Sequence, residues 1–428
     1  MALSKICFLL CSMSLLLLSG CTSDLIYRSD YKLCAVSAGN PCNDHSLQLH
    51  NGHADNAYML GFVEIDDQGQ LRDRHQLQML LDTIYAEAAE SSVLINVFVH
   101  GWHHNAAPGD RNIESFSTSL AKLSQLEHDL SQLKKRPARK VIGVYVGWRG
   151  ESISVPVINN LTFWERKNTA QDVGLLGVSE LLLKLEEVTN VKNASLTAPK
   201  SRLVIFGHSF GGAVVYTATS QILASRFVDS RLNKNYQGSA NGFGDLVVLL
   251  NPAFEALRYA PFYDLAQARC SYFADQVPKL AILTSEADDA TGLMFPAGRV
   301  FSTFFETHNT VKRNDCNHSV TLDEGEADRK TAGHYMPLIS HTLKPAAQAK
   351  TMQAANYAAM KSIWGSQHNA SSTQYGSTVL THLGRTSPLN PYLNIRVSKE
   401  LIANHNDVFG DQIMEFLRLL IVLSAADE

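Results

Sequence analysis

One serine lies in a glycine-rich motif whose spacing suits nucleophilic chemistry. Gly207, Ser209 and Gly211 form the pattern G-x-S-x-G, and Gly212 extends it. An apolar run at 203–206 precedes the motif, and a helix-like stretch follows it. A strand that turns sharply into a helix leaves no room for side chains at the two outer glycines, and the strained turn holds the hydroxyl out above the sheet. The pattern therefore predicts that Ser209 is a nucleophile rather than part of an ordinary glycine-rich turn.

Two further segments accompany this motif. Residues 99–106 have the sequence Val-His-Gly-Trp-His-His-Asn-Ala, and residues 147–150 have the sequence Gly-Trp-Arg-Gly after another apolar run. Together with the serine motif, these segments resemble the bacterial α/β-hydrolase superfamily over roughly residues 58–428. The resemblance implies a mostly parallel sheet with helices on both faces, and a triad in the chain order Ser, Asp, His. It leaves the substrate open, because this fold carries many activities.

A serine nucleophile also needs hydrogen-bond donors for the oxyanion that develops during attack. In this fold one donor belongs to the loop after an upstream strand and the other to the residue after the nucleophile. The resemblance therefore places the oxyanion hole at the backbone N–H groups of Trp102 and Phe210. Trp102 is also expected at the mouth of the substrate pocket. The residues predicted to contact substrate are His100, Gly101, His103 and Asn105.

The histidines at positions 100, 103 and 104 raise the question of a metal site. They follow a predicted strand instead of lying at i and i+4 on a helix, and no cysteine or carboxylate with zinc-type spacing lies nearby. We therefore predict no metal, and the chemistry of a serine hydrolase needs no organic cofactor.

Chain order selects the other members of the predicted triad. The apolar run at 280–283 leads into an acidic segment, in which Asp288 resembles the acid turn of the family more closely than Glu286 or Asp289 does. The acid orients the imidazole and stabilises the imidazolium that forms. The base is expected between the last strand and the last helix, and His405 occupies that place.

Apolar runs alternate with amphipathic stretches through most of the chain, which is typical of a parallel sheet covered on both faces. Strands are predicted at 58–65, 93–99, 141–146, 203–206, 246–250 and 280–283. Helices are predicted at 76–89, 113–133, 164–188 and 213–224. The pattern ends with a strand at 392–397 and an amphipathic helix at 408–423.

The segment 291–390 breaks this alternation with clusters of His, Asp, Ser and Gly, and only residues 346–364 look helical. We predict an insertion before the last strand, which could act as a lid. Its histidines at 318, 334 and 341 are assigned surface or lid roles, and His382 precedes the last strand instead of following it. Phenylalanines at 295, 301, 304 and 305 would suit a lipase lid, although buried packing explains them equally well.

The N-terminus carries Lys5, an apolar run at 6–18 and then Leu-Ser-Gly-Cys, which resembles the lipobox of bacterial lipoproteins. Residues 1–20 are thus predicted to be a lipoprotein signal peptide, with a lipid on Cys21. An ordinary cleaved signal peptide or an uncleaved anchor is the alternative. Thr22 stands where an aspartate would indicate the inner membrane, so we expect an envelope protein of the outer membrane that faces the periplasm. Residues 21–57 are polar and are expected to form a tether.

Of the seven cysteines, three belong to the predicted signal peptide or lipid anchor. An even remainder in an exported chain fits two disulfides. Cys34 and Cys42 are close in sequence and are predicted to pair. Cys270 and Cys316 are either the second pair or two free thiols.

Composition is that of an ordinary globular protein, with 45% hydrophobic and 18% charged residues among 428. Residues 58–428 are expected to form one catalytic domain, and a net charge of −4 argues against nucleic-acid binding. The sequence predicts a serine hydrolase that cleaves a small-molecule ester or a lipid through an acyl-enzyme. A non-catalytic envelope binding protein on the same scaffold and a lipase acting on membrane lipid are the alternatives, and oligomeric state is left open.

Overall fold

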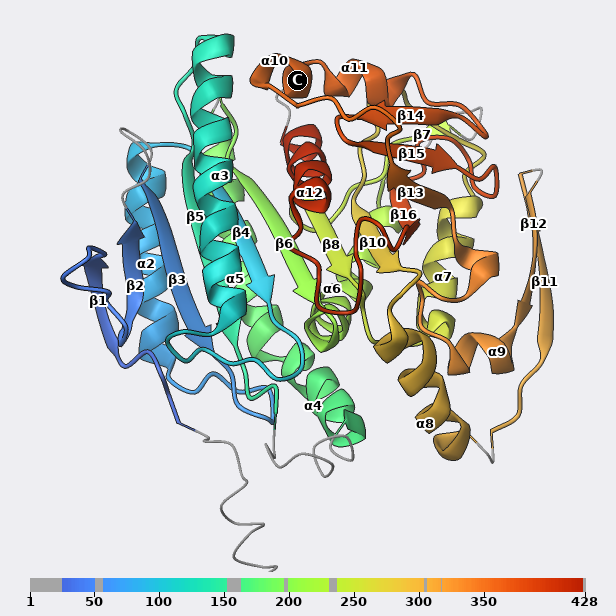
Figure 1. Ribbon diagram of the computed structural model, residues 1–428, viewed down its shortest axis with the longest axis horizontal. Helices are drawn as coiled ribbons and strands as arrows, with labels where there is room; N and C mark the ends of the chain where they lie inside the picture. Colours follow the sequence, from blue (N-terminus) through green and yellow to red (C-terminus); the bar gives the residue numbers. More distant parts are fainter. Residues whose placement is uncertain are drawn as a thin grey trace, which may run out of the picture.

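The computed structural model describes residues 25–50, 57–151, 163–195, 199–230, 237–303, 306–316 and 318–425. A 12-stranded sheet runs through the molecule in the order β1-β2-β3-β5-β4-β6-β8-β10-β16-β13-β15-β14 (Figure 1). Every neighbouring pair from β3 to β13 is parallel. These strands are β3 (Tyr58–Glu64), β5 (Lys140–Gly147), β4 (Val93–Val99), β6 (Arg202–His208), β8 (Leu246–Leu250), β10 (Leu280–Ser285), β16 (Tyr392–Val397) and β13 (His341–Pro345).

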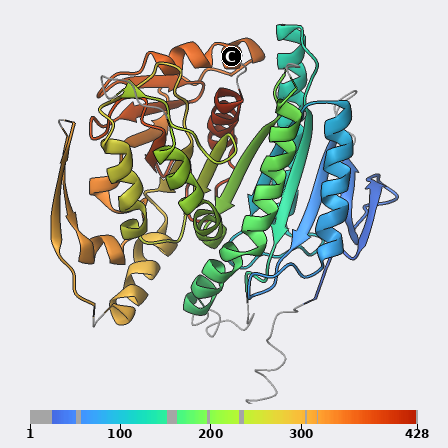
Figure 2. The ribbon, with the colours of Figure 1, turned by 180° about the vertical axis from the view of Figure 1, so that it is seen from behind.

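Helices cover both faces of the sheet, as the alternating pattern predicted (Figures 1 and 2). One face carries α2 (Arg74–Glu90), α5 (Gly177–Asn193) and α6 (Phe210–Val228), and the other carries α3 (Arg111–Lys134) and α12 (Asp411–Ser424). Side chains of Asp73 and Asp110 cap the first turns of α2 and α3. The helix expected at 164–188 is two helices, since one residue separates α4 (Phe163–Leu175) from α5.

Strands near the middle of the sheet are buried along their whole length. All residues of β3, β4, β8 and β10 are buried, which explains why these segments are continuous apolar runs instead of alternating ones. Among the residues that the structure describes, no helix is both long enough and apolar enough to cross a membrane.

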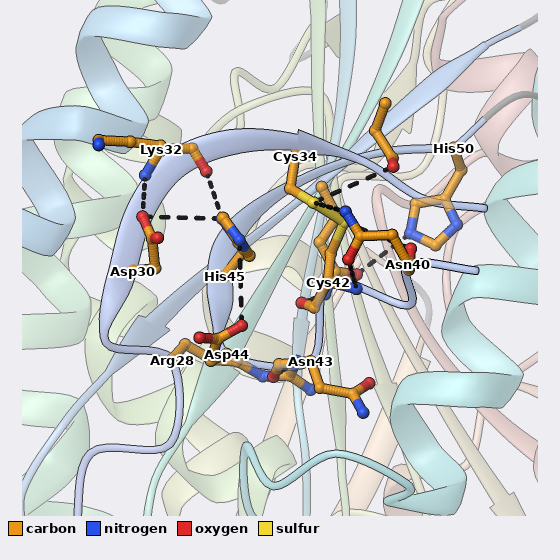
Figure 3. Close-up of a disulfide and its surroundings, with 12 residues drawn as sticks. Arg28, Asp30, Lys32, Cys34, Asn40, Cys42, Asn43, Asp44, His45 and His50 are labelled. Atoms are coloured by element: carbon orange, nitrogen blue, oxygen red, sulfur yellow. Dashed lines mark hydrogen bonds and ion pairs between the residues drawn. A yellow bond between two sulfur atoms is a disulfide. The ribbon is translucent and has the colours of Figure 1, made fainter. Parts of the chain in front are cut away.

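One edge of the sheet is formed by part of the segment 21–57, which was predicted to be a polar tether. Within that segment, β1 (Asp30–Ala35) pairs with β2 (His45–His50), and β2 runs antiparallel to β3. The predicted disulfide between Cys34 and Cys42 is present beside them (Figure 3). Some buried side chains at this edge are polar. The side chain of Gln48, for example, is buried and donates to the carbonyl of Cys42. The apolar residues of β1 and β2 do alternate with polar ones, but each strand is only six residues long and lies in a mostly polar segment that was predicted to be a tether.

The other edge is formed by part of the segment 291–390, which was predicted to be an insertion. Three strands of this segment extend the main sheet: β13, β15 (Thr378–His382) and β14 (Ser372–Tyr375). The last strand of the chain, β16, lies between β10 and β13, so the segment continues the sheet beyond it. Because β15 is antiparallel to both β13 and β14, the sheet is mixed and not purely parallel.

Smaller elements complete the second half of the chain. A separate hairpin pairs β11 with β12, and β7 pairs with β9 in another two-stranded sheet. The predicted helix at 346–364 is replaced by two short helices, α10 and α11. Their bounds and those of the remaining elements are η2 (Ala290–Met294), α8 (Phe295–Ser302), β11 (Thr310–Asp315), β12 (His318–Asp323), α9 (Glu324–Arg329), η3 (Met336–Leu338), α10 (Ala354–Ala358), α11 (Met360–Gly365), α7 (Ala256–Gln267), β7 (Gln237–Gly238) and β9 (Ser271–Tyr272).

Candidate active site

The predicted nucleophile lies on a turn of one residue between β6 and α6. Ser209 has φ 56° and ψ −121°, a backbone conformation that side-chain-bearing residues rarely adopt. A Cβ at Gly207 would lie 2.5 Å from the carbonyl oxygen of Gly211, and a Cβ at Gly211 would collide with the carbonyl of Val99. The turn therefore requires both glycines, and it presents Ser209 at the carboxyl end of a central strand.

The structure brings Ser209 together with the predicted acid and base. His405 Nε2 lies 2.7 Å from Ser209 Oγ, and His405 Nδ1 lies 2.7 Å from Asp288 Oδ1. Asp288 follows β10 and His405 follows β16, and both strands are parallel to β6. Carboxyl ends of neighbouring parallel strands meet at one edge of a sheet, which is why residues so distant in sequence meet there.

Hydrogen bonding determines which nitrogen of His405 carries the proton. Nδ1 faces a carboxylate, which accepts, so Nδ1 donates and the lone pair of Nε2 faces the hydroxyl of Ser209. That is the tautomer in which an imidazole can accept the proton of a serine hydroxyl.

The carboxylate of Asp288 is buried and held by a neighbouring threonine. The backbone N–H of Thr291 donates to Oδ1 over 3.1 Å, and its hydroxyl donates to Oδ2. Burial alone would raise the pKa of Asp288, but the bonds from His405 and Thr291 outweigh it and hold this pKa below its usual value. The group is therefore ionised at neutral pH and can stabilise an imidazolium.

The rival acids and histidines lie elsewhere or contact the site indirectly. Glu286 and Asp289 are exposed, and Glu286 lies 3.9 Å from the guanidinium of Arg396. His334 Nε2 reaches the site only through the hydroxyl of Thr291, 3.1 Å away. His341 differs from its predicted surface or lid role, because it is buried in β13.

The loop after β4 packs directly against the nucleophile turn. A Cβ at Gly101 would lie 2.7 Å from Ser209 Cβ, so only glycine allows this approach. Trp102 follows Gly101, and its ring packs against Phe163, with the centroids 5.4 Å apart. Phe210 is the first residue of α6, and the N–H groups of a first helical turn have no partner within the helix. Trp102 and Phe210 therefore flank Ser209, where oxyanion donors are expected.

His100 lies beneath the loop and not at its surface, where the predicted substrate contact would place it. Its ring is fully buried, and burial lowers its pKa to about 4. Its Nδ1 donates to the carbonyl of Gly101 over 2.9 Å, and its Nε2 accepts the backbone N–H of Trp148 over 3.1 Å. The indole of Trp148 donates back to the carbonyl of His100 over 2.9 Å. His100 therefore braces the loop from beneath, because the end of β4 directs its side chain into the core.

The remaining predicted substrate contacts have different surroundings. His103 is partly exposed, with φ 66°, and its Nδ1 lies 2.7 Å from the carboxylate of Glu151. The side-chain oxygen of Asn105 accepts the N–H of Ala107 over 2.8 Å, which helps to shape the loop. His104 pairs with Asp110 at 3.0 Å, so the three imidazoles of this loop have three different partners.

Within the described part of the chain, one group of side chains outside this site has metal-ligating chemistry. Ligand atoms of Glu306, His308 and Asp328 all lie within 4.8 Å of one another. Arg299 already forms an ion pair with Asp328 at 2.5 Å, which supplies the positive charge that a cation would bring. We assign no metal to this group.

Several residues that shape the site had no sequence signal of their own. Trp148 was visible only as part of a motif, and Thr291 lies in a segment taken for an insertion. His208, Asn251 and Ser285 lie at or just after the carboxyl ends of β6, β8 and β10. The rule that ligands bind at such strand ends could have drawn attention to these three.

No protein-family model matches the chain, and neither does any curated protein. Among solved structures, the chain is similar to a Trichoderma reesei cutinase in complex with a phosphonate inhibitor. The two are 15% identical, the likeness covers 50% of this chain and 77% of the cutinase chain, and the TM-score is 0.19. A likeness of this size carries no argument about activity. The class that the fold defines is an α/β protein with a large, mixed and mostly parallel sheet.

Proposed function

We propose that this protein is a serine hydrolase of the α/β-hydrolase type that cleaves carboxylic esters. The observation that carries the proposal is the chain of contacts from Asp288 through His405 to Ser209, with both links at 2.7 Å. The strained conformation of Ser209 supports it, because such strain in a buried turn persists where the position of the side chain matters.

The proposed reaction has two halves. Ser209 Oγ attacks the ester carbonyl as His405 Nε2 takes the hydroxyl proton, and Asp288 stabilises the resulting imidazolium. The N–H groups of Trp102 and Phe210 would hold the negative oxygen of the tetrahedral intermediate. His405 then gives its proton to the leaving alcohol, which leaves an acyl-enzyme. A water molecule, deprotonated by His405, releases the acid and restores the serine.

Two alternatives remain distinct from this proposal. A non-catalytic binding protein has no need of an imidazole whose lone pair faces a serine hydroxyl, so the geometry disfavours it. A lipase would be favoured by an apolar lid, but Phe295 is fully buried and packs against Trp164, with ring centroids 5.7 Å apart. The other predicted lid phenylalanines have side chains outside the described residues. Rates on p-nitrophenyl esters of increasing chain length separate an esterase from a lipase.

Covalent labelling tests the nucleophile. A fluorophosphonate probe is expected to label the wild-type protein, and Ser209→Ala is expected to abolish labelling while the protein stays folded. The matched control is Ser366→Ala, because Ser366 is exposed and its hydroxyl donates to the nearby carbonyl of Ile363. Equal labelling of Ser209→Ala and wild type would refute the proposal.

The base is tested by comparing two histidines. His405→Ala is expected to lower kcat on an activated ester by several orders of magnitude, since the serine then has only its intrinsic reactivity. His334→Ala is expected to cost far less, because His334 contacts the site only through Thr291. The reverse ranking would assign the base to the 291–390 segment.

We further propose that Cys21 carries a lipid that anchors the protein in the bacterial envelope, at the outer membrane. This proposal rests on the sequence at 18–21 alone, which lies outside the described residues. Cys21→Ala is expected to move the protein from the membrane fraction to the soluble fraction. Retention of the variant in the membrane fraction would contradict the anchor.

A further inference from the structure

The backbone carbonyl of His405 is held by two side chains from other parts of the sheet. His208 Nε2 lies 2.9 Å from this oxygen, and Asn251 Nδ2 donates to it over 2.9 Å. Both side chains are buried, with 2% of His208 and none of Asn251 exposed. A carbonyl that accepts two buried hydrogen bonds has both lone pairs engaged, so the backbone of His405 is fixed from beneath.

A third side chain continues this arrangement. Asn251 Oδ1 accepts the backbone N–H of Ser285 over 2.9 Å, and Ser285 Oγ donates to the carbonyl of Ile402 over 2.6 Å. Asn251 has φ 43°, a left-handed conformation that asparagine tolerates better than most residues. The loop of His405 is therefore tied at two points to the carboxyl ends of three neighbouring strands.

We propose that His208 and Asn251 are positioning residues that set the distance between the nucleophile and the base. The inference rests on the proposed function, because it assigns a role relative to Ser209 and His405. His208 directly precedes Ser209, so its bond to the His405 carbonyl ties the base to the turn that carries the nucleophile. Neither residue transfers a proton or touches the reacting atoms.

The protonation state of His208 fits this role. Its Nε2 faces a carbonyl oxygen, which can only accept, so Nε2 carries the proton. Its Nδ1 is buried and has no hydrogen-bond partner among the residues that the structure describes. Burial, followed by repulsion from His405, lowers the pKa of His208 to about 3. The ring is therefore neutral at working pH, and its proton is committed to the carbonyl and not available for catalysis.

Substitutions of matched reach separate positioning from packing. Glutamine places its amide nitrogen near the position of an imidazole Nε2, whereas asparagine is too short and alanine has no donor. We expect His208→Ala and His208→Asn to lower kcat roughly 10- to 100-fold with little change in KM, since small misplacements of reacting groups cost about this much. His208→Gln is expected to recover most of the loss.

The second hydrogen bond to the carbonyl of His405, which comes from Asn251, is tested independently. Asn251→Asp preserves the size and the acceptor for Ser285, but it replaces the donor that faces the His405 carbonyl with an oxygen. We expect kcat to fall and KM to hold here as well. His341→Ala is the control, because His341 is a comparably buried histidine outside the site. It is expected to lower stability while the kcat of the folded fraction stays at the wild-type value.

Each kcat is calculated from the concentration of active sites, which is measured by titration with the fluorophosphonate probe. A wild-type kcat in His208→Ala or in Asn251→Asp would overturn the inference, and so would equal kcat values for His208→Gln and His208→Asn. Failure of the probe to label the wild-type protein would instead refute the proposed function. The two failures are therefore distinguishable in one set of measurements.

Discussion

Replacing Asp288 with asparagine changes one atom at the centre of the proposed triad. The carboxylate is 1% exposed and accepts bonds from His405 and Thr291. An asparagine has nearly the same volume, so packing should be preserved. The change removes a buried charge next to an imidazole that must become positively charged during attack.

Two losses contribute to the expected rate. Unit charges about 4 Å apart interact by roughly 4 kcal/mol at an effective dielectric constant of about 20. At about 1.4 kcal/mol for each factor of ten, that is roughly a thousandfold in rate. In addition, an amide N–H facing Nδ1 would move the imidazole proton to Nε2, where it blocks the hydroxyl of Ser209. We therefore expect kcat to fall roughly 10³- to 10⁴-fold.

The assay is steady-state hydrolysis of an activated ester, with kcat and KM measured separately. KM should change little, because buried Asp288 does not reach a substrate. The matched control is Asp289→Asn, which alters the exposed neighbouring carboxylate and should leave kcat within a factor of about two. An Asp288→Asn enzyme that keeps a tenth or more of wild-type kcat, or an equal loss in Asp289→Asn, would refute this reasoning.

Three further predictions follow from single contacts. Gly101→Ala should lower kcat about a hundredfold, since the new Cβ would lie 2.7 Å from the Cβ of Ser209. Gly39→Ala is the control and should leave kcat unchanged in the same assay, because a Cβ at Gly39 would have no described atom within 4 Å. The structure joins Cys270 and Cys316, whose pairing the sequence left open, in a disulfide that spans 46 residues. Replacing both with serine should lower the free energy of unfolding by up to about 4 kcal/mol, so an unchanged denaturant midpoint would contradict this prediction. The folded-state pKa of Asp288 lies below its ordinary value of 3.8, so the ionised carboxylate stabilises the fold above pH 3.8. This stabilisation is lost as the pH falls through the folded-state pKa. In Asp288→Asn, the free energy of unfolding should therefore decrease less steeply at acidic pH than in the wild type.

Local patterns carried the sequence predictions that concern the sheet and the nucleophile turn. The continuous apolar runs at β4 and β8 identify strands buried on both faces, because such strands need no polar side. The glycines around Ser209 mark a strand-to-helix turn, because only glycine fits there. Chain order then pointed to Asp288 and His405, and in the structure His405 contacts both Ser209 and Asp288.

Tertiary structure alone decided what surrounds these residues. The partner of His100 is Trp148, and the partners of the His405 carbonyl come from 197 and 154 residues away in sequence. Bonds between such distant residues leave no periodic mark in a sequence, so a buried bracing histidine and a substrate-contacting one look alike.

The same reason accounts for the two edges of the sheet. The strands at 30–50 and at 341–382 join the sheet through backbone pairing, and several of their buried positions are polar side chains whose hydrogen bonds are satisfied there. The periodicity of apolar residues indicates which side chains are buried, but it does not indicate which backbone segments pair. The sequence by itself thus determined the parallel centre of the sheet and the nucleophile turn, whereas the edges and the bracing contacts of the site depended on long-range hydrogen bonds.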